Sequence, residues 1–477
     1  MNASHPLPGG SLVDGDDWNS LQDSLAGRVV LPDSPGYEAA RKPAIANFHE
    51  VRPQAVVTCE TAGDVSGAIL FARKHGLRAV PRSGGHCFAG RSSTEGIVID
   101  VSPMNAVSVS SGVATVGAGA RLGGVYDALD AHGLTIPAGC GPDVGISGLT
   151  LGGGLGILGR KHGLTSDSLI SAQAVLADGR IVECDENRHE DLFWALRGAG
   201  GGRFGIVTSF VFRTVPAPEA TAFRLIWPHD RAAEIIPVWQ SWSPAAPDEM
   251  AASLLLSAPS DPAEPPEVNV FGAMVGTESD VAELLEDLVA KVRVDPASAT
   301  LEHAPYRETK RYLAEHGPGD DRPDGHQLNK SEFFRRPLPE EAIEALVENF
   351  QAGRVAGQSR ELDFTPWGGA YNRVPADATA FAHRDGLFAL LHMVIIGPDA
   401  SDAEREDARG WLGRSWSAVH AWGSGGVYPN WPDPDLEDWA RAYHGGNLGR
   451  LVDIKAKYDP DDFFRFHQSV PGRATRG

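Results

Sequence analysis

Alternating strand-like and helix-like patterns run through residues 51–214. Short apolar runs bounded by turn residues predict strands at 55–59, 77–80, 96–101, 106–116 and 206–215. Thr61 and Asp64 have the spacing of a capping box, and apolar residues then recur at helical spacing until Gly76. A second helix begins near Leu122 and ends before Gly133. The pattern predicts a unit that mixes sheets and helices.

The pattern changes after Pro216 and Pro218. Residues 223–227, 267–275 and 387–396 predict strands, residues 279–294 and 340–351 predict polar helices, and residues 257–267 and 317–324 predict loops. A compact pattern returns at the end of the chain, where a helix over 447–458 ends before Pro460. The sequence therefore predicts an α+β protein with a main domain at 1–215, an inserted α/β domain at 216–424 and a C-terminal return at 425–477.

Composition narrows the class of protein. The 477 residues are 42% hydrophobic and 22% charged, which is typical of a folded globular chain of two or three units. The net charge of −21 repels phosphate backbones and argues against nucleic-acid binding. No apolar run approaches membrane-spanning length, and residues 1–18 lack the apolar core of a secretion signal. Four cysteines without a CxxC pair suit a reducing compartment, so we expect a cytoplasmic protein without a membrane partner.

Several catalytic motifs are absent from the sequence. There is no HExxH or His/Cys cluster, which argues against a metal site, and no GxSxG nucleophile elbow. Residues 154–159 and 200–205 both match GxGxxG, but neither follows a strand and opens a helix, as a dinucleotide-binding Rossmann fold requires. A nicotinamide-dependent dehydrogenase is therefore disfavoured. The three glycine loops at 84–85, 145–156 and 198–205 either cradle a long anionic dinucleotide or form tight turns.

The segment Arg82-Ser83-Gly84-Gly85-His86 resembles the histidine-bearing loop of berberine-bridge-enzyme-like FAD-linked oxidases. These enzymes belong to the vanillyl-alcohol-oxidase superfamily, whose FAD domain is of the PCMH type. Further segments match that family in the same order, and they are residues 144–154, 191–198, 202–208, 428–431, 443–447 and 458–464. The resemblance covers nearly the whole chain from about residue 50.

The resemblance implies an FAD domain built from both ends of the chain and a central domain whose antiparallel sheet covers the flavin. His86 would bond covalently to the flavin 8α-methyl group, and withdrawal of electron density would raise the redox potential. The residues that the resemblance places at the cofactor are Arg82, Ser83, Gly84, Gly85, His86, Cys140, Gly145, Ser147, Gly148, Gly152, Gly153, Gly205, Ile206, Val207, Asn430, Tyr443 and Asn447.

The cysteine of a second covalent link is displaced in this sequence. Many relatives attach a cysteine to flavin C6, and counting back from Val144 places that position at Gly141. The thiol here is one residue earlier, at Cys140, and a one-residue shift in a tight loop turns a side chain elsewhere. We therefore expect a single link through His86.

The family also carries acid/base residues on a strand that follows a His-Arg pair, here His383-Arg384. His392 lies on that strand as its one titratable side chain, so we expect it to be the general base. Tyr428 is the alternative base. Trp367 and Tyr371 either wall the substrate pocket or belong to the core.

These features predict an FAD-dependent oxidase. Hydride would pass from a carbon of a sugar, an alcohol or a secondary-metabolite scaffold to flavin N5, and dioxygen would reoxidise the flavin to give hydrogen peroxide. A dehydrogenase with a quinone or protein acceptor is one alternative, and a catalytically silent flavin-bearing binding protein is another. Retention of both His392 and Tyr428 argues against the silent protein. The partners expected are a small-molecule substrate and dioxygen, and the oligomeric state is left open.

Overall fold

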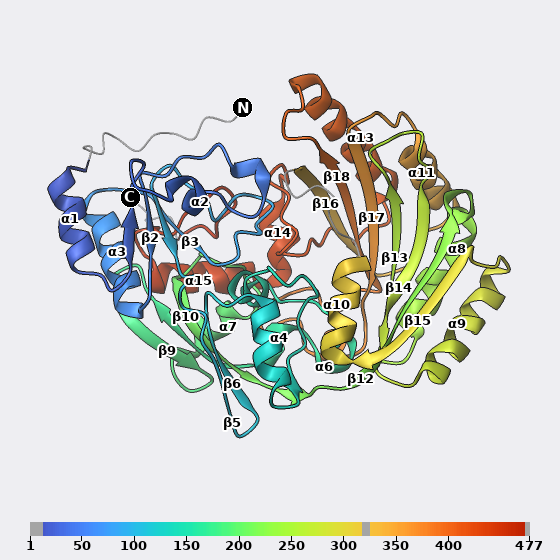
Figure 1. Ribbon diagram of the computed structural model, residues 1–477, viewed down its shortest axis with the longest axis horizontal. Helices are drawn as coiled ribbons and strands as arrows, with labels where there is room; N and C mark the ends of the chain where they lie inside the picture. Colours follow the sequence, from blue (N-terminus) through green and yellow to red (C-terminus); the bar gives the residue numbers. More distant parts are fainter. Residues whose placement is uncertain (1–12, 317–324, 473–477) are drawn as a thin grey trace.

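A computed structural model describes residues 13–316 and 325–472 (Figure 1). The loop predicted at 317–324 lies outside the described residues, as do residues 1–12 of the segment predicted to lack a secretion signal. The described chain combines helices with four sheets, so the α+β prediction is confirmed. None of the helices in the described ranges is both long and apolar enough to cross a membrane.

Three sheets come from the first part of the chain. The first has the order β1-β2-β4-β3, with parallel pairing among its last three strands, at Arg28–Val30, Ala55–Thr58, Ile97–Asp100 and Ala79–Arg82. The second is antiparallel, in the order β5-β6-β10-β8-β9, at Val107–Ser110, Val113–Gly117, Ile206–Arg213, Leu169–Val175 and Ile181–Asp185. The third pairs β11 (Val215–Pro216) with β7 (Leu134–Thr135).

Local sequence explains two features of this part. Thr61 and Asp64 form the expected capping box at the start of α3 (Ala62–Lys74). The strand expected at 106–116 is instead the hairpin β5–β6, because Ser111 and Gly112 both have positive φ angles, as a two-residue turn requires.

The fourth sheet has seven antiparallel strands in the order β15-β12-β14-β13-β17-β18-β16. These strands are Ser298–Pro305, Glu219–Pro228, Glu267–Met274, Met250–Ala258, Gln358–Pro366, Phe388–Ile396 and His326–Phe334. One face of this sheet packs under a helix layer, which buries Trp227, Trp239 and Trp411 completely. The layer contains α8 (Ala232–Ala245), α9 (Glu278–Val292), α11 (Glu340–Gln351) and α13 (Asp402–His420), seen on the outer side of the sheet in Figure 1.

The other face of the seven-stranded sheet is directed toward the first part of the chain. Leu391, Met393 and Ile395 of β18 pack there against Phe88 and Trp431. Helix α10 (Tyr306–His316) joins the two parts, since Arg307 forms an ion pair with Asp127 of α4 (Leu122–Asp130) at 2.6 Å.

The described C-terminal segment packs against the part of the chain that forms the first three sheets. Helix α14 (Trp439–His444) leads into α15 (Leu448–Tyr458), whose Tyr458 hydroxyl donates to Asp191 of α7 (Glu190–Leu196) at 2.7 Å. The remaining helices are α1 (Gly15–Asp23), α2 (Tyr37–Arg41), α5 (Ile146–Leu151), α6 (Gly159–His162) and α12 (Ala370–Arg373). The first three sheets thus use residues before 217 and the fourth uses residues after 218, while the domain boundaries at 215/216 and 424/425 stay a prediction.

Candidate cofactor and active site

A cavity of about 380 Å³ lies where the loops of the first two sheets meet the C-terminal segment. Its wall comes mainly from residues 81–88, 144–151, 200–207 and 428–432. The sequence-predicted residues that line it are Arg82, Ser83, Gly84, Gly85, His86, Gly145, Ser147, Gly148, Gly205, Ile206, Val207, Tyr428 and Asn430. The structure therefore brings three glycine loops, far apart in sequence, to one site.

Backbone forms much of this wall because two glycine loops touch. A Cβ atom on Gly84 would lie 2.3 Å from the Gly145 nitrogen, and one on Gly145 would lie 2.3 Å from the Gly84 nitrogen. The hydroxyls of Ser83 and Ser147 donate to one acceptor, the Ala118 carbonyl, at 2.8 and 2.5 Å. These contacts fix the two loops to each other, and any residue larger than glycine would force them apart.

His86 is held as a neutral imidazole in the cavity wall. Burial lowers the pKa of His86, and the nearby Arg121 lowers it further. Its Nε2 atom is buried and has no hydrogen-bond partner in the described chain. A neutral ring nitrogen carries the free electron pair that attack on a methyl-derived electrophile requires, so the histidine suits covalent attachment of a cofactor.

The charge of the cavity is opposite to that of the whole chain. Arg82 and Arg91 line it, and no Asp or Glu is among its described lining residues. Arg82 donates hydrogen bonds to the Ala40 and Ser92 carbonyls, at 2.8 and 3.1 Å. It therefore fixes the loop in place and adds a positive charge to the cavity wall. A glycine-backbone wall with two cations suits the diphosphate of a dinucleotide such as FAD.

Tyr428 and Asn430 form one end of the cavity. The Tyr428 hydroxyl oxygen accepts from the Gly154 and Leu155 amides and from Asn430 Nδ2, at 3.1, 3.2 and 3.1 Å. A phenol oxygen has two acceptor lone pairs, which these donors share, and none of these contacts uses the hydroxyl's own proton. Burial raises the pKa of Tyr428, which keeps that proton on the oxygen at neutral pH.

Several residues expected at the cofactor lie outside the cavity wall, and these are Cys140, Gly152, Gly153, Tyr443 and Asn447. Gly152 contributes to the cavity indirectly, by leaving room for Asn430, because a Cβ atom on Gly152 would lie 2.0 Å from Asn430 Oδ1. Asn447 Nδ2 donates to the carbonyls of Ala376 and Thr379, at 2.7 and 3.1 Å. Tyr443 is bound to the backbone of Asp433. Tyr443 and Asn447 match the family's motifs, but their side chains hold neighbouring segments of the backbone in place.

Cys140 lies in the loop beside the cavity. Its neighbour Gly139 lines the wall, whereas Cys140 itself is close enough to Lys310, Tyr126 and Tyr306 to perturb their pKa values. Lys310 is buried and donates to the Gly139 carbonyl at 2.9 Å and to the Ala138 carbonyl. Cys140 thus lies outside the cavity wall and near a lysine and two tyrosines, and the single link through His86 stays a prediction.

His392 is on the wrong face of the sheet for a catalytic base. It is fully buried, and its Nδ1 atom contacts the Ser415 hydroxyl of α13 at 2.8 Å, in the helix layer. Neighbouring Leu391 and Met393 face the cavity side instead. Burial lowers the pKa of His392 to about 3, with a smaller effect from Lys330. His392 is a core histidine, and the expectation that it reaches the substrate is wrong.

Asp363 is the carboxyl group that sequence reasoning missed. On β17 it pairs with Leu391 of β18, so its side chain faces the cavity side of the sheet. Burial raises its pKa to about 7, and Thr365 Oγ1 donates to it at 3.4 Å. The sequence feature that points to Asp363 is its place between Leu362 and Phe364, two core residues that face the other side of the strand. A carboxyl group that titrates near neutrality is suited to general-base catalysis.

The aromatic residues expected near the substrate belong to the core. Trp367 and Tyr371 stack with a ring-centroid distance of 4.3 Å, are almost fully buried, and pack behind Tyr428. The Tyr371 hydroxyl is bonded to the Gly156 backbone at 3.1 and 3.0 Å. They support the end of the cavity that carries Tyr428. No group of three potential metal ligands occurs within the described ranges.

Comparisons with known proteins identify the family of the chain. Residues 53–185 match the model of the FAD binding domain family, and residues 427–471 match the berberine and berberine-like family. The chain is 34% identical to the uncharacterized FAD-linked oxidoreductase YgaK of Bacillus subtilis, over 94% of this chain and 97% of that protein. It is 30% identical to the chitooligosaccharide oxidase of Gibberella zeae, over 88% of each chain.

Solved structures give the same result. The berberine-bridge-enzyme-like protein 1 of Physcomitrella patens superposes with a TM-score of 0.85 at 28% identity, over 96% of this chain and 99% of that one. The predicted two-part FAD fold of the PCMH type is thereby confirmed. The chain belongs to the berberine-bridge-enzyme-like family of FAD-linked oxidoreductases.

Proposed function

We propose that the protein is an oxidase that removes hydride from a hydroxyl-bearing carbon of a small molecule. The cavity carries this proposal, since glycine loops, a neutral His86 and two arginines line it, and its lining residues Phe88 and Trp431 pack against the sheet face that holds Asp363. When bound, FAD would supply the hydride acceptor, with dioxygen as the final electron acceptor and hydrogen peroxide as the product. The protein's own residues bind and orient the substrate and remove its proton.

His86 is the covalent anchor in this proposal, and Cys140 is not. The buried, unpartnered Nε2 and the lowered pKa support a neutral, reactive imidazole at residue 86. The position of Cys140 outside the cavity wall, near Lys310 and two tyrosines, supports a single link. A covalent histidine both tethers the flavin and raises its potential, so that poor hydride donors become accessible.

Asp363 is the proton acceptor, and Tyr428 orients the substrate oxygen. A base must be ionised at working pH and yet basic enough to take a proton, which a carboxyl pKa of about 7 satisfies. The Tyr428 oxygen already accepts three hydrogen bonds, so its proton is available to donate to a substrate oxygen. The two groups come from different parts of the chain, Asp363 from the seven-stranded sheet and Tyr428 from the C-terminal segment that lines the cavity.

Hydroxyl-rich substrates fit the polar row across the sheet. Ser331, Leu391 and Asp363 are successive cross-strand partners on β16, β18 and β17. Ser331 Oγ and Asn329 Nδ2, on the same face, are buried with no partner in the part of the chain that the structure describes. Unpaired buried polar atoms are costly unless a ligand satisfies them. Similarity to the chitooligosaccharide oxidase supports the same class, and we therefore favour a sugar or sugar-bearing substrate.

Anaerobic mixing tests this function. Chitobiose, cellobiose and coniferyl alcohol would be added to the purified yellow protein as representative amino-sugar, sugar and aromatic-alcohol donors. An oxidase bleaches with a donor and regains its colour in air with one equivalent of peroxide. Bleaching that persists in air would favour a dehydrogenase. A flavin that dithionite bleaches and no donor does would favour the silent binding protein.

A further inference from the structure

The edge strand β16 holds the segment that carries Tyr428. We call residues 424–433 the tyrosine segment. The Ser424 amide donates to the Phe333 carbonyl at 2.9 Å, and the Phe333 amide donates to the Gly426 carbonyl at 2.9 Å. The segment therefore begins as an extension of the sheet edge, and from there it runs to Tyr428, Asn430 and the cavity.

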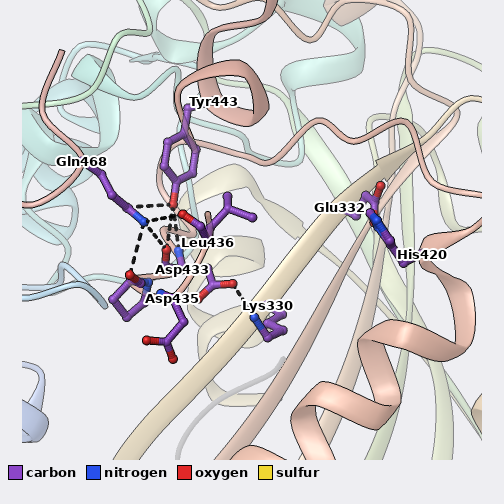
Figure 2. A network of polar contacts seen from close by, with 9 residues as sticks. Lys330, Glu332, His420, Asp433, Asp435, Leu436, Tyr443 and Gln468 are labelled. Atoms are coloured by element: carbon purple, nitrogen blue, oxygen red, sulfur yellow. Dashed lines mark hydrogen bonds and ion pairs between the residues drawn. The ribbon is translucent and has the colours of Figure 1, made fainter. Parts of the chain in front are cut away.

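Glu332 of β16 anchors the start of the tyrosine segment. Its carboxylate is 2% exposed and accepts from the Gly425 amide at 2.7 Å. It also accepts from His420 Nδ1 at 2.8 Å, and the two side chains lie together in Figure 2. Gly423 is required beside it, because a Cβ atom there would lie 2.0 Å from Glu332 Oε1. This end of the segment is thus fixed to the sheet by a buried acid.

Lys330 of β16 anchors the other end. Its Nζ atom forms an ion pair with Asp433 at 2.6 Å, and Asp433 is only 5% exposed (Figure 2). The Asp433 backbone is in turn held by the Tyr443 hydroxyl and by Gln468 Nε2, at 2.9 and 2.8 Å. Because Asp433 is buried and Lys330 is partly buried, removal of the lysine leaves the Asp433 carboxylate buried without its cation.

This network extends to the cofactor cavity. Gln468 Oε1 accepts from Arg91 at 3.0 Å, and Arg91 lines the cavity. Tyr428 and Asn430 lie between the anchors of Glu332 and Lys330 and also line the cavity. The edge of the substrate-side sheet is therefore connected at two points to the wall that would hold the flavin.

We propose that Lys330 is a positioning residue, whose ion pair with Asp433 sets the place of Tyr428 and Asn430 relative to the flavin and substrate. The proposal rests on the proposed function in one respect, namely that Tyr428 acts on the substrate. Small displacements of an orienting group cost large factors in rate, so the pair would govern turnover although it touches no reacting atom.

The test compares Lys330→Met with Lys330→Arg, with the double variant Lys330→Met/Asp433→Asn, and with a control. Arg307→Met is the matched control, because the Arg307–Asp127 pair has the same 2.6 Å length and also bridges the two parts of the chain. Three quantities are measured on each holoprotein: the anaerobic rate of flavin reduction against donor concentration, the visible flavin spectrum, and hydrogen exchange in peptides that cover 424–433.

We expect Lys330→Met to lower the limiting reduction rate about tenfold or more while the half-saturating donor concentration changes less than about threefold. Exchange in the tyrosine segment should become faster and the flavin spectrum should shift. Lys330→Arg should restore most of the rate, the neutral double variant should fold and stay slow, and Arg307→Met should resemble the unmodified protein.

A reduction rate and a segment exchange within about twofold of the unmodified protein in Lys330→Met would overturn the proposal. An equal loss in Arg307→Met would also overturn it, since that result indicates general loosening between the two parts. If no donor reduces the unmodified protein, the proposed function fails. The spectrum and the exchange of the tyrosine segment then still decide whether Lys330 positions it.

Discussion

Asp363 and Leu391 are cross-strand partners, and both side chains face the cavity side of the seven-stranded sheet. His392, one residue further along β18, faces Ser415 in the helix layer. This relationship moves the expected proton acceptor from β18 to the neighbouring strand β17. It also explains how a strand that matches the family's acid/base strand can present only apolar residues to the cavity.

Replacement of Asp363 by Asn should slow flavin reduction by about 10²–10⁴-fold, the usual contribution of a general base. In the unmodified protein the reduction rate should rise with pH through about 7, because the ionised carboxylate is the active form. The variant should lose this pH dependence. Stopped-flow reduction between pH 5 and 9 measures both, and an unchanged pH profile in the variant would exclude Asp363 as the base.

The same carboxyl group makes stability depend on pH. Its folded-state pKa is raised from the ordinary 3.8 to about 7, so in this window the folded state binds more protons than the unfolded state. The contribution of Asp363 should therefore lower the free energy of unfolding as pH rises from 3.8 to about 7. Denaturant melts should show that Asp363→Asn is relatively more stable at pH 8 than at pH 4. A constant difference would contradict the raised pKa.

His392→Leu should leave the rate of flavin reduction within about twofold of the unmodified protein. It should lower the free energy of unfolding by about 1–3 kcal/mol, because the buried Ser415 hydroxyl loses its hydrogen-bond partner. The double variant His392→Leu/Ser415→Ala removes both polar partners and should regain much of that stability. Urea melts and anaerobic reduction measure the two effects. A large loss of rate with normal stability would return His392 to the active site.

Tyr428→Phe should both destabilise the cavity wall and slow turnover. The change deprives the Gly154 and Leu155 amides and Asn430 of their acceptor, at a cost of about 1–3 kcal/mol for a buried unsatisfied group. Loss of the donated proton should also weaken substrate orientation. Kinetics with the best donor, compared with a thermal melt of the holoprotein, would contradict this role if both were unchanged.

Much of the fold could be predicted from local signals. The capping box at Thr61 and Asp64 begins α3, and α11 has the predicted bounds. The hairpin at Ser111 and Gly112 was missed because apolar residues continue on both sides of a two-residue turn. The spacing of the glycine loops left a dinucleotide cradle and tight turns as alternatives, because their meeting at one cavity depends on the crossing of strands that are distant in sequence.

The contacts of individual side chains at the candidate site could not be predicted from the sequence. All nine residues of β18 are buried, so the usual alternation of polar and apolar positions is absent and the strand gives no sign of which face His392 takes. Tyr443 and Asn447 lie in matched motifs, yet their partners are backbone groups of Asp433, Ala376 and Thr379. A motif identifies the segment, whereas the tertiary packing decides what each side chain contacts.

We propose that FAD occupies the glycine-lined cavity and is attached through His86 alone. It is tested most directly by acid denaturation of the purified protein, followed by mass mapping of the flavin-bearing peptide in the unmodified protein and in Cys140→Ser. We predict flavin on the peptide that contains His86, and unchanged attachment in Cys140→Ser. Flavin that bridges the His86 and Cys140 peptides, or flavin released freely to the supernatant, would contradict the account.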